Sequence, residues 1–263
     1  MSPKHSSAHF LYPVSRRQIK RKIFQYLASR PLGEIFELLA SYPDVVVVNV
    51  LFMALCDHDR RIRWRAISCF GDVVPRIEKK QREQARIIMR RFLWSLNDES
   101  GGIGWGAPEA MAEIMVNSEH LRGEYLHMLI SYAQEDGDEL FQDGNFLELP
   151  MLQRGLLWGI GRMNYSCTEL MLETGVDREL VKYFDSQDRE VKNLALWALA
   201  GLDVKIAKEV LPEPPQENET LTVYQNGIFE EINMLALFNQ VTSAVQLSPV
   251  EACDWPMAKS LPR

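Results

Sequence analysis

The sequence predicts an all-α fold, an α-solenoid of stacked helix pairs, with a small C-terminal β-hairpin and helix appended to it. Four segments repeat one pattern, in which an aliphatic residue is followed by a small residue four places on and a large apolar residue eight places on. This spacing places the three side chains on one face of a helix. Amphipathic stretches lie between the four segments, and the dipeptide Asn226-Gly227 is a strong signal of a hairpin turn.

The elements before the repeats are expected to cap the solenoid. The segment 1–42 contains two predicted helices, Ser15–Ser29 and Leu32–Ala40, and the first of them is basic and amphipathic. Terminal units of a solenoid must cover an apolar face that would otherwise be exposed. The run 45–48 consists of four valines, which β-propensity alone would place in a strand. Because the first helix of the first repeat belongs at this position, we expect tertiary packing to make the run helical.

The repeats occupy the segment 43–211. Their aliphatic anchors lie 41, 49 and 39 residues apart and are Ile62, Ile103, Leu152 and Val191. The later units take their first helix from the amphipathic stretches 79–96, 121–134 and 168–184. In the second copy, Pro108 is expected in the first turn of the helix, which leaves the glycine-rich residues 101–106 as a loop.

The first and last copies resemble the second helix of a HEAT repeat, of the kind found in bacterial PBS-lyase HEAT-like modules. The matching residues are Asp59, Ile62, Arg63, Ala66, Phe70 and Gly71 in the first copy and Asp188, Val191, Lys192, Ala195 and Leu199 in the last. The middle copies depart from the pattern, with Gly104 and Gln153 at the basic position. The run SLNDESGGIGWGAPEAM is also similar to a segment of bacterial HEAT-repeat proteins of unassigned function. The resemblance covers residues 43–201 and implies a HEAT-like α-solenoid, a fold that mostly scaffolds or binds.

The chain changes character after the repeats. The segment 212–220 is rich in proline and acidic residues and is predicted to be a linker that no helix crosses. The segment 221–247 contains two β-prone runs around the turn, followed by a helix-like stretch, and residues 248–263 are expected to form a flexible tail. An isolated hairpin is only marginally stable in water. We therefore expect this one either to dock on the solenoid as a C-terminal cap or to offer its edge to a strand of a partner or of a second copy.

Composition restricts the class of protein. Of the 263 residues, 46% are hydrophobic and 25% are charged, which is typical of a globular chain. No apolar run approaches the roughly 20 residues of a membrane span, and the beginning of the sequence has no sustained apolar segment of signal-peptide type. The four cysteines lie far apart, as in proteins of a reducing compartment. We expect a cytoplasmic protein that does not enter membranes.

The net charge of −7 is unevenly distributed. Residues 1–91 contain 18 Lys and Arg against 8 Asp and Glu, whereas residues 92–263 contain 11 against 28. A basic segment raises the prospect of an anionic partner such as nucleic acid, although such charges more often belong to the solvated faces of helices. The asymmetry permits head-to-tail association as well as charge pairing within a curved monomer, so the oligomeric state stays open.

A stripe of tryptophans marks the candidate binding surface. The residues two and six places after each anchor lie opposite the apolar face of the repeat helix, on the side that lines the concave surface of such solenoids. Every copy has a tryptophan at one of these two positions. Trp and Arg dominate binding hot spots, and the alternative is that the rings fill gaps between neighbouring repeats. The predicted partner-binding residues are Arg63, Trp64, Trp105, Glu109, Arg154, Trp158 and Trp197.

Signals for catalysis, metals or cofactors are weak. His58 lies between two aspartates at a predicted turn, where Asp is expected as a helix cap. The acidic run EDGDELFQDG lacks the residue order of a calcium loop, and the glycines of 101–106 lack the spacing of a phosphate-binding loop. We therefore expect no metal and no cofactor, and a non-catalytic scaffold or adaptor that binds another protein through its concave face.

Two other functions stay open. The first is a nucleic-acid-binding solenoid that uses the basic N-terminal third for phosphates and tryptophans for base stacking. The second is a lyase or a chaperone for a cofactor-carrying protein, which only the PBS-lyase resemblance implies.

Overall fold

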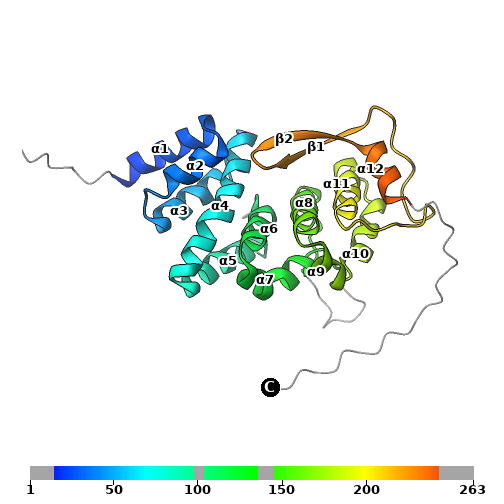
Figure 1. Cartoon of the computed structure of the whole chain (residues 1–263), viewed down its shortest axis with the longest axis horizontal. Helices are drawn as coiled ribbons and strands as arrows, with labels where there is room; N and C mark the ends of the chain where they lie inside the picture. The colour runs from blue at the N-terminus through cyan, green and yellow to red at the C-terminus, as the bar shows by residue number, and fades with distance from the viewer. Residues whose placement is uncertain (1–14, 98–103, 136–144, 243–263) are drawn as a thin grey trace, which may run out of the picture.

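The computed structural model describes residues 15–97, 104–135 and 145–242, and these form an α-solenoid together with one two-stranded sheet (Figure 1). The first elements are α1 (Arg16–Ser29), α2 (Leu32–Leu39) and α3 (Asp44–Ala54). They pack against one another and against the first long repeat helix.

Local sequence fixes the beginnings of these helices. The Ser15 hydroxyl accepts a hydrogen bond from the Gln18 main-chain N–H, and the Gln18 side chain accepts one from the Ser15 N–H, which is a capping box. The run of four valines lies inside α3, where Val47 and Val48 are buried. The helical prediction for this run is confirmed, because burial in the core outweighs the modest helix penalty of valine.

Four helices stack side by side into an inner layer. They are the second helices of the predicted repeats, α4 (Arg60–Lys80), α6 (Ala107–Asn117), α8 (Pro150–Ser166) and α11 (Arg189–Ala200). Asp59 and Asp188 cap α4 and α11 by accepting hydrogen bonds from main-chain N–H groups of the first turn. Pro108 lies in the first turn of α6, as predicted.

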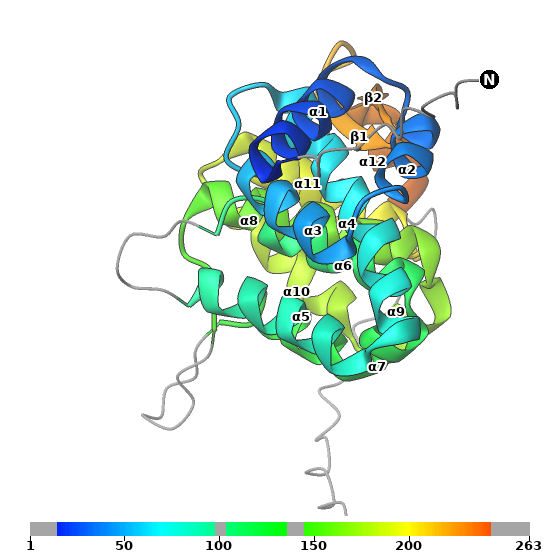
Figure 2. The ribbon, with the colours of Figure 1, turned by 90° about the vertical axis from the view of Figure 1, so that its left-hand side faces the viewer.

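The first helices of the repeats form an outer layer. It contains α5 (Arg82–Leu96), α7 (Glu119–Ser131), α9 (Thr168–Glu173), α10 (Val176–Lys182) and the 3₁₀ turn η2 (Tyr183–Asp185). In Figure 2, α5, α7 and α9 lie below the inner layer and the hairpin lies above it. The predicted stretch 168–184 is not one helix, because Gly175 has a φ of 69° and separates α9 from α10.

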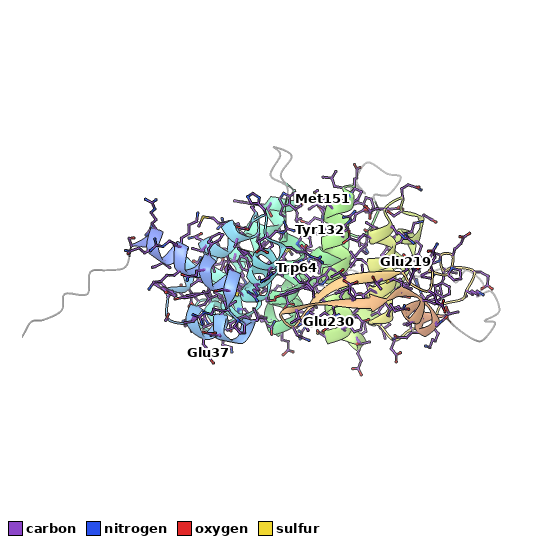
Figure 3. All side chains as sticks on the ribbon, turned by 90° about the horizontal axis from the view of Figure 1, so that it is seen from above. Glu37, Trp64, Tyr132, Met151, Glu219 and Glu230 are labelled. Atoms are coloured by element: carbon purple, nitrogen blue, oxygen red, sulfur yellow. The ribbon has the colours of Figure 1, made fainter. Side chains whose placement is uncertain are left out.

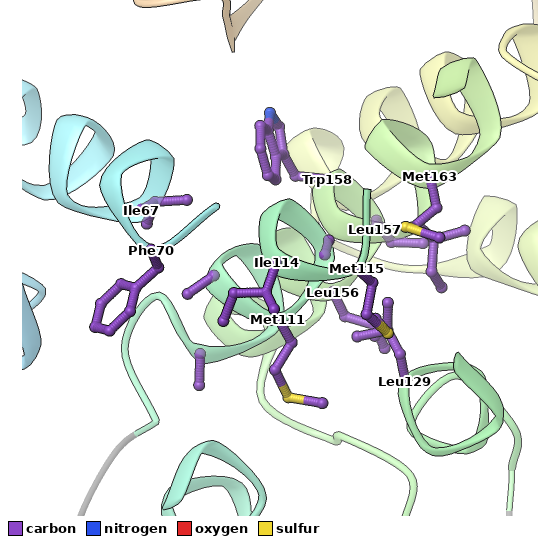
Figure 4. Close-up of a cluster of buried hydrophobic side chains, with 14 of the residues drawn as sticks. Ile67, Phe70, Met111, Ile114, Met115, Leu129, Leu156, Leu157, Trp158 and Met163 are labelled. Carbon is purple, nitrogen blue, oxygen red and sulfur yellow. The ribbon is translucent and has the colours of Figure 1, made fainter. Parts of the chain in front are cut away.

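The repeat pattern supplies the core. The residues four and eight places after the anchors are buried, and they are Ala66, Phe70, Ala107, Met111, Leu156, Ile160, Ala195 and Leu199. The anchor Ile103 lies outside the described residues. Figure 4 shows Phe70, Met111 and Leu156 meeting in one cluster from three different helices.

Glycines let the inner helices approach one another closely. A β-carbon on Gly159 of α8 would lie 3.0 Å from the Pro108 carbonyl oxygen and 3.2 Å from the Ala112 β-carbon, both on α6. A β-carbon on Gly71 of α4 would lie 3.0 Å from the Glu113 carbonyl oxygen on the same helix α6. These contacts fix the spacing of the inner layer, and with it the spacing of the side chains that point away from the core.

The C-terminal elements are β1 (Thr220–Gln225), β2 (Ile228–Asn233) and α12 (Met234–Val241). The strands pair antiparallel, with Gln225 opposite Ile228. Asn226 and Gly227 have φ angles of 50° and 91°, the left-handed conformation that a two-residue hairpin turn requires. The predicted hairpin and its turn are confirmed.

The hairpin lies across the inner layer, from α11 at one end to α2 at the other (Figure 1). At its tip, a β-carbon on Gly227 would lie 3.1 Å from the Leu32 β-carbon of α2. The helix α12 packs on α11, whereas the hairpin spans most of the length of the solenoid. Across the three described stretches of the chain, no helix combines the length and the apolar character that a membrane span needs.

Candidate functional site

A cavity of about 550 Å³ lies between the inner layer and β1, and we call it the hairpin cavity. The N-terminal halves of α4, α6, α8 and α11 each contribute side chains to it, and β1 contributes Thr220, Leu221 and Thr222. In Figure 3, Trp64 and Met151 lie on the same side of the hairpin as Glu219, which precedes β1, and Glu230 of β2 lies on the other side. The cavity therefore lies on the β1 side of the hairpin.

Six of the seven predicted partner-binding residues line this cavity, namely Arg63, Trp64, Trp105, Glu109, Arg154 and Trp158. They come from α4 and α8 and from α6 with the turn before it, which the glycine contacts hold at close spacing. Most of positions two and six thus meet at one place because the helices stack with their N-terminal halves side by side. Their role in binding a partner stays a prediction.

An aromatic cluster joins the hairpin to the inner layer. The rings of Trp64 and Trp158 meet edge to face with centroids 4.6 Å apart, and the Trp64 ring stacks on Tyr224 of β1 at 5.2 Å. The Trp158 Nε1–H donates a hydrogen bond of 3.2 Å to the Tyr224 carbonyl oxygen. Figure 4 shows the Trp158 ring pointing out of the apolar cluster toward the hairpin. Two of the predicted tryptophans therefore hold the hairpin in place as well as lining the cavity.

Trp197 lies elsewhere. Its side chain is only 1% exposed and does not line the hairpin cavity. The ring packs directly over Gly161 of α8 and against Tyr165, with ring centroids 5.2 Å apart. This is the gap-filling role between neighbouring repeats that the sequence left open as the alternative.

Two of the arginines at the cavity are neutralised by carboxylates. Arg154 pairs with Asp188 at 2.6 Å and with Glu190 at 2.7 Å, and its hydrogen bond lowers the pKa of Asp188. Arg189 donates two hydrogen bonds, of 2.9 and 2.7 Å, to the carboxylate of Glu219 and lowers its pKa. The second pair ties the root of β1 to α11.

Two other arginines lack such partners. The Arg60 guanidinium lies over the Phe229 ring of β2, 4.2 Å from its centroid. One Nη of Arg63 donates a hydrogen bond of 3.1 Å to the Asp57 carbonyl oxygen. Within the described parts of the chain, neither arginine forms an ion pair with a carboxylate. The charges of Arg60 and Arg63 act on the carboxyl groups of Glu231 and Glu109 without forming an ion pair with them. The α4 side of the cavity therefore has two guanidinium groups that no carboxylate of the described residues contacts directly.

Glu109 presents a carboxyl group in unusual surroundings. It lies against Gly155, where a β-carbon would be 2.7 Å from the carboxyl atoms. Its Oε2 atom is buried and has no hydrogen-bond partner among the described residues. Burial raises the pKa of Glu109 to about 7, and the charge of Arg63 offsets this only in part. The carboxyl group therefore keeps its proton to a higher pH than an ordinary Glu does.

The sequence contained a signal for some residues that the prediction missed. Arg60 and Arg189 lie two places before their anchors, so the stripe of positions two and six continues one turn toward the helix beginnings. Applying the four-residue spacing once more would have found both arginines. The contribution of Thr222 had no such signal, because a strand sequence does not indicate where a hairpin docks.

The weaker sequence signals do not assemble into a site. Among the residues that the structure describes, no group of His, Cys, Asp and Glu is placed to hold a metal ion. Burial raises the pKa of the Cys69 thiol well above its usual value, which suppresses the reactive thiolate. Most of the acidic run EDGDELFQDG and the first glycines of 101–106 lie outside the described residues.

No family model matches the chain, and no curated protein matches it in sequence. One similar solved structure is a designed armadillo repeat protein in complex with peptide (KR)4, at 17% identity and a TM-score of 0.42, over 74% of this chain and 77% of that one. Computationally designed armadillo repeat proteins for modular peptide recognition match at 17% identity and a TM-score of 0.39, over 70% and 74% of the two chains. An engineered protein matches at 16% identity and a TM-score of 0.39, over 73% and 82%. The fold is assigned from the helices of this chain.

Proposed function

We propose that this chain is a non-catalytic, cytoplasmic repeat module of HEAT type that binds an extended segment of another protein in the hairpin cavity. The observation that carries the proposal is the convergence of Trp64, Trp105 and Trp158 with several arginines in one cavity of ligand size. Tryptophan and arginine supply most of the binding energy in many protein interfaces. The free thiols of Cys56, Cys69 and Cys167 support a reducing compartment.

The edge of β1 favours a polypeptide over a small molecule. Gln225 and Ile228 flank a two-residue turn, so they form a hydrogen-bonded pair. From this pair onward, the N–H and C=O groups of successive β1 residues point alternately toward β2 and away from it. The N–H and C=O groups of Thr222 and Tyr224 thus point away from β2. The hydrogen bond from Trp158 to the Tyr224 carbonyl agrees with this alternation. Thr222 lines the cavity, so its main chain offers one donor and one acceptor to an added strand.

Site-specific photo-cross-linking tests the proposal. A benzophenone amino acid replaces Trp105, which lines the cavity and is 41% exposed, in the full chain expressed in its native cells. The matched control places the same group at Trp94 on the outer helix α5, which is 78% exposed and does not line the cavity. We expect one discrete protein adduct from position 105 that nuclease treatment leaves intact and that position 94 does not form.

Two further results decide the test. The adduct should disappear when Trp158 is replaced by Ala in the same chain, because this removes one wall of the cavity and an anchor of the hairpin. Equal labelling from positions 105 and 94, or an adduct indifferent to the Trp158 change, contradicts the cavity as the binding site.

A nucleic-acid partner is the second candidate, favoured by a separate surface. A cavity of about 760 Å³ beside α1 is lined by Arg17, Lys20 and Arg21 together with Phe24. Basic side chains next to an aromatic ring suit a phosphate backbone with a stacked base. Binding of single-stranded RNA that weakens steeply with salt and is lost after Arg17→Glu and Lys20→Glu would favour this function over the first.

A further inference from the structure

We infer that the segment taken into the hairpin cavity is acidic, with carboxylates that contact Arg60 and Arg63. This inference rests on the proposed function, because it names the chemistry of the partner at the same site. It concerns the charge of the bound segment, which neither the tryptophans nor the strand edge determines.

The orientation of the inner helices adds partial positive charge to one side of the cavity. The beginnings of all four helices border it, through Arg60 of α4, Gly106 before α6, Met151 of α8 and Arg189 of α11. Each helix carries a partial positive charge at its N-terminus, from main-chain N–H groups that have no partner within the helix. Asp59 and Asp188 already cap the beginnings of α4 and α11, whereas α6 and α8 have no side-chain cap. The uncapped beginnings of α6 and α8 therefore favour an anion in the cavity.

The side-chain charges add to this field on one side of the cavity. Arg154 and Arg189 are paired with carboxylates on or next to α11, so that side is close to neutral. On the α4 side, Arg60 and Arg63 form no ion pair within the described residues, and each keeps N–H groups for a ligand. Glu231, which is hydrogen-bonded to Thr222 of the cavity wall, and Glu109 interact with these two arginines only through longer-range charge. A guanidinium group binds a carboxylate through two parallel hydrogen bonds, which are charge-assisted and strong.

Glu109 is compatible with an anionic ligand. Its carboxyl group lines the same cavity as the tryptophans, and its buried Oε2 has no hydrogen-bond partner within the described residues. The charged groups that border the same cavity are Arg60 and Arg63 from α4, Arg154 from α8, and Arg189 and Glu190 from α11. A carboxylate from a ligand favours the protonated form of Glu109, which then donates a hydrogen bond to it. Binding of an acidic segment is thereby coupled to uptake of a proton.

Matched peptides test the charge preference directly. Three end-blocked peptides of equal length alternate leucine with Glu, with Gln or with Lys, and their binding to the full chain is measured by calorimetry. We expect the Glu peptide to bind at least about tenfold more tightly than the Gln peptide, and the Lys peptide to bind most weakly. Replacing both Arg60 and Arg63 by Gln should remove this difference. Arg61→Gln is the control, since Arg61 lies on the same helix, is exposed and does not line the cavity.

The pH dependence supplies a second readout with a defined sign. Between about pH 6 and pH 8 the peptide carboxylates stay ionised, because their pKa is about 4.3, whereas Glu109 loses its proton. The affinity for the Glu peptide should therefore fall as the pH rises, and Glu109→Gln should bind as tightly as the wild type at low pH with no such fall. A cationic ligand would show the opposite trend.

Each outcome decides between the inference and the proposed function. Preference for the Lys peptide, or affinity that rises with pH, overturns the acidic segment. Equal binding of the three peptides also overturns it, while the cavity remains a peptide site and the proposed function stands. Failure of all three to bind at concentrations up to about 1 mM overturns the inference and leaves the proposed function to the cross-linking result at Trp105.

Discussion

Trp158 and Trp197 occupy the same position in consecutive repeats and meet different neighbours. Gly161 of α8 has no side chain, so the Trp197 ring packs directly against that helix, and Trp197 is 1% exposed. Trp158 is also buried, at 3% exposed, but it lies beneath the hairpin, where its indole N–H donates a hydrogen bond to the Tyr224 carbonyl oxygen. The neighbours of each ring, and not its position in the repeat, distinguish the two tryptophans.

The Gly161 contact leads to a stability prediction. Gly161→Ala places a methyl group against the Trp197 ring, and overpacking of this kind costs about 1–3 kcal/mol. The matched control is Gly123→Ala on α7, where a β-carbon would meet nothing within 4 Å and the change should stabilise the helix slightly. Urea denaturation of both variants measures the difference. Equal stability of the two would show that Trp197 does not rest on α8.

Glu109 gives a pH-dependent stability with a defined sign. Its pKa is about 7 in the folded chain against 4.5 for an ordinary Glu, so the folded state binds this proton more tightly than the unfolded state. Stability contributed by the protonated group is present below pH 4.5 and is lost as the pH rises through 7, by on the order of 3 kcal/mol at most. Glu109→Gln, which stays neutral, should raise the melting temperature at about pH 8 and leave it nearly unchanged at about pH 4.

The exposed residue Glu37 of α2 provides the control for this prediction, since Glu37→Gln is the same chemical change on the surface. Its effect on melting temperature should be small at both values of pH. If Glu109→Gln lowers the melting temperature at high pH, then the carboxylate of Glu109 has a stabilising partner in the folded chain.

The elements differ in how far the sequence predicts them. The period of the apolar residues predicted α4, α8 and α11, because a helix buries the residues that share one of its faces whatever packs on them. Asn226 and Gly227 predicted the hairpin, since the turn depends only on their own backbone conformation. The docking position of the hairpin depends on contacts such as Trp158 with Tyr224, 66 residues apart in the chain. No local pattern in the sequence carries that information.

The candidate site was predictable as far as it depends on helical spacing, and not where it depends on the docking of the hairpin. Positions two and six of each repeat follow from helical spacing, and the structure brings most of these residues to one cavity. The prediction put Trp197 on the binding surface, because helical spacing takes no account of the size of the residue on the neighbouring helix. The wall formed by β1, with Thr222, could not be predicted from the sequence, because it depends on where the hairpin docks.

Tyr224 is one of three buried residues of β1, with Leu221 and Val223, that dock the hairpin. Its ring is 2% exposed and stacks on Trp64. Tyr224→Ala removes this contact, so we expect the hairpin to detach while the helices stay folded. Hydrogen exchange should accelerate in residues 220–233 and remain unchanged in α5 and α7. The control is Ile228→Ala, whose side chain is 58% exposed and should not affect exchange. Unchanged exchange in Tyr224→Ala would mean that other contacts hold the hairpin.

The whole molecule departs from a simple solenoid, in which each repeat contacts only its neighbours. The hairpin contacts α11 at its root, α8 and α4 along its length, and α2 at its tip. It thereby links α2 to α11 across the described helices and closes one side of the hairpin cavity. The proposed site exists only while the hairpin is docked, so the arrangement of the whole chain determines whether a partner segment finds its binding surface.

Nuclear Overhauser effects between selectively labelled Tyr224 and the two tryptophans test this arrangement most directly. The docked hairpin predicts cross-peaks from the Tyr224 ring to the Trp64 ring, whose centroids are 5.2 Å apart, and a Trp158 indole N–H protected from exchange by its bond to the Tyr224 carbonyl. Both signals should be lost in Tyr224→Ala. Absence of the cross-peaks in the wild-type chain, together with a freely exchanging Trp158 N–H, would contradict the docked hairpin and the cavity that depends on it.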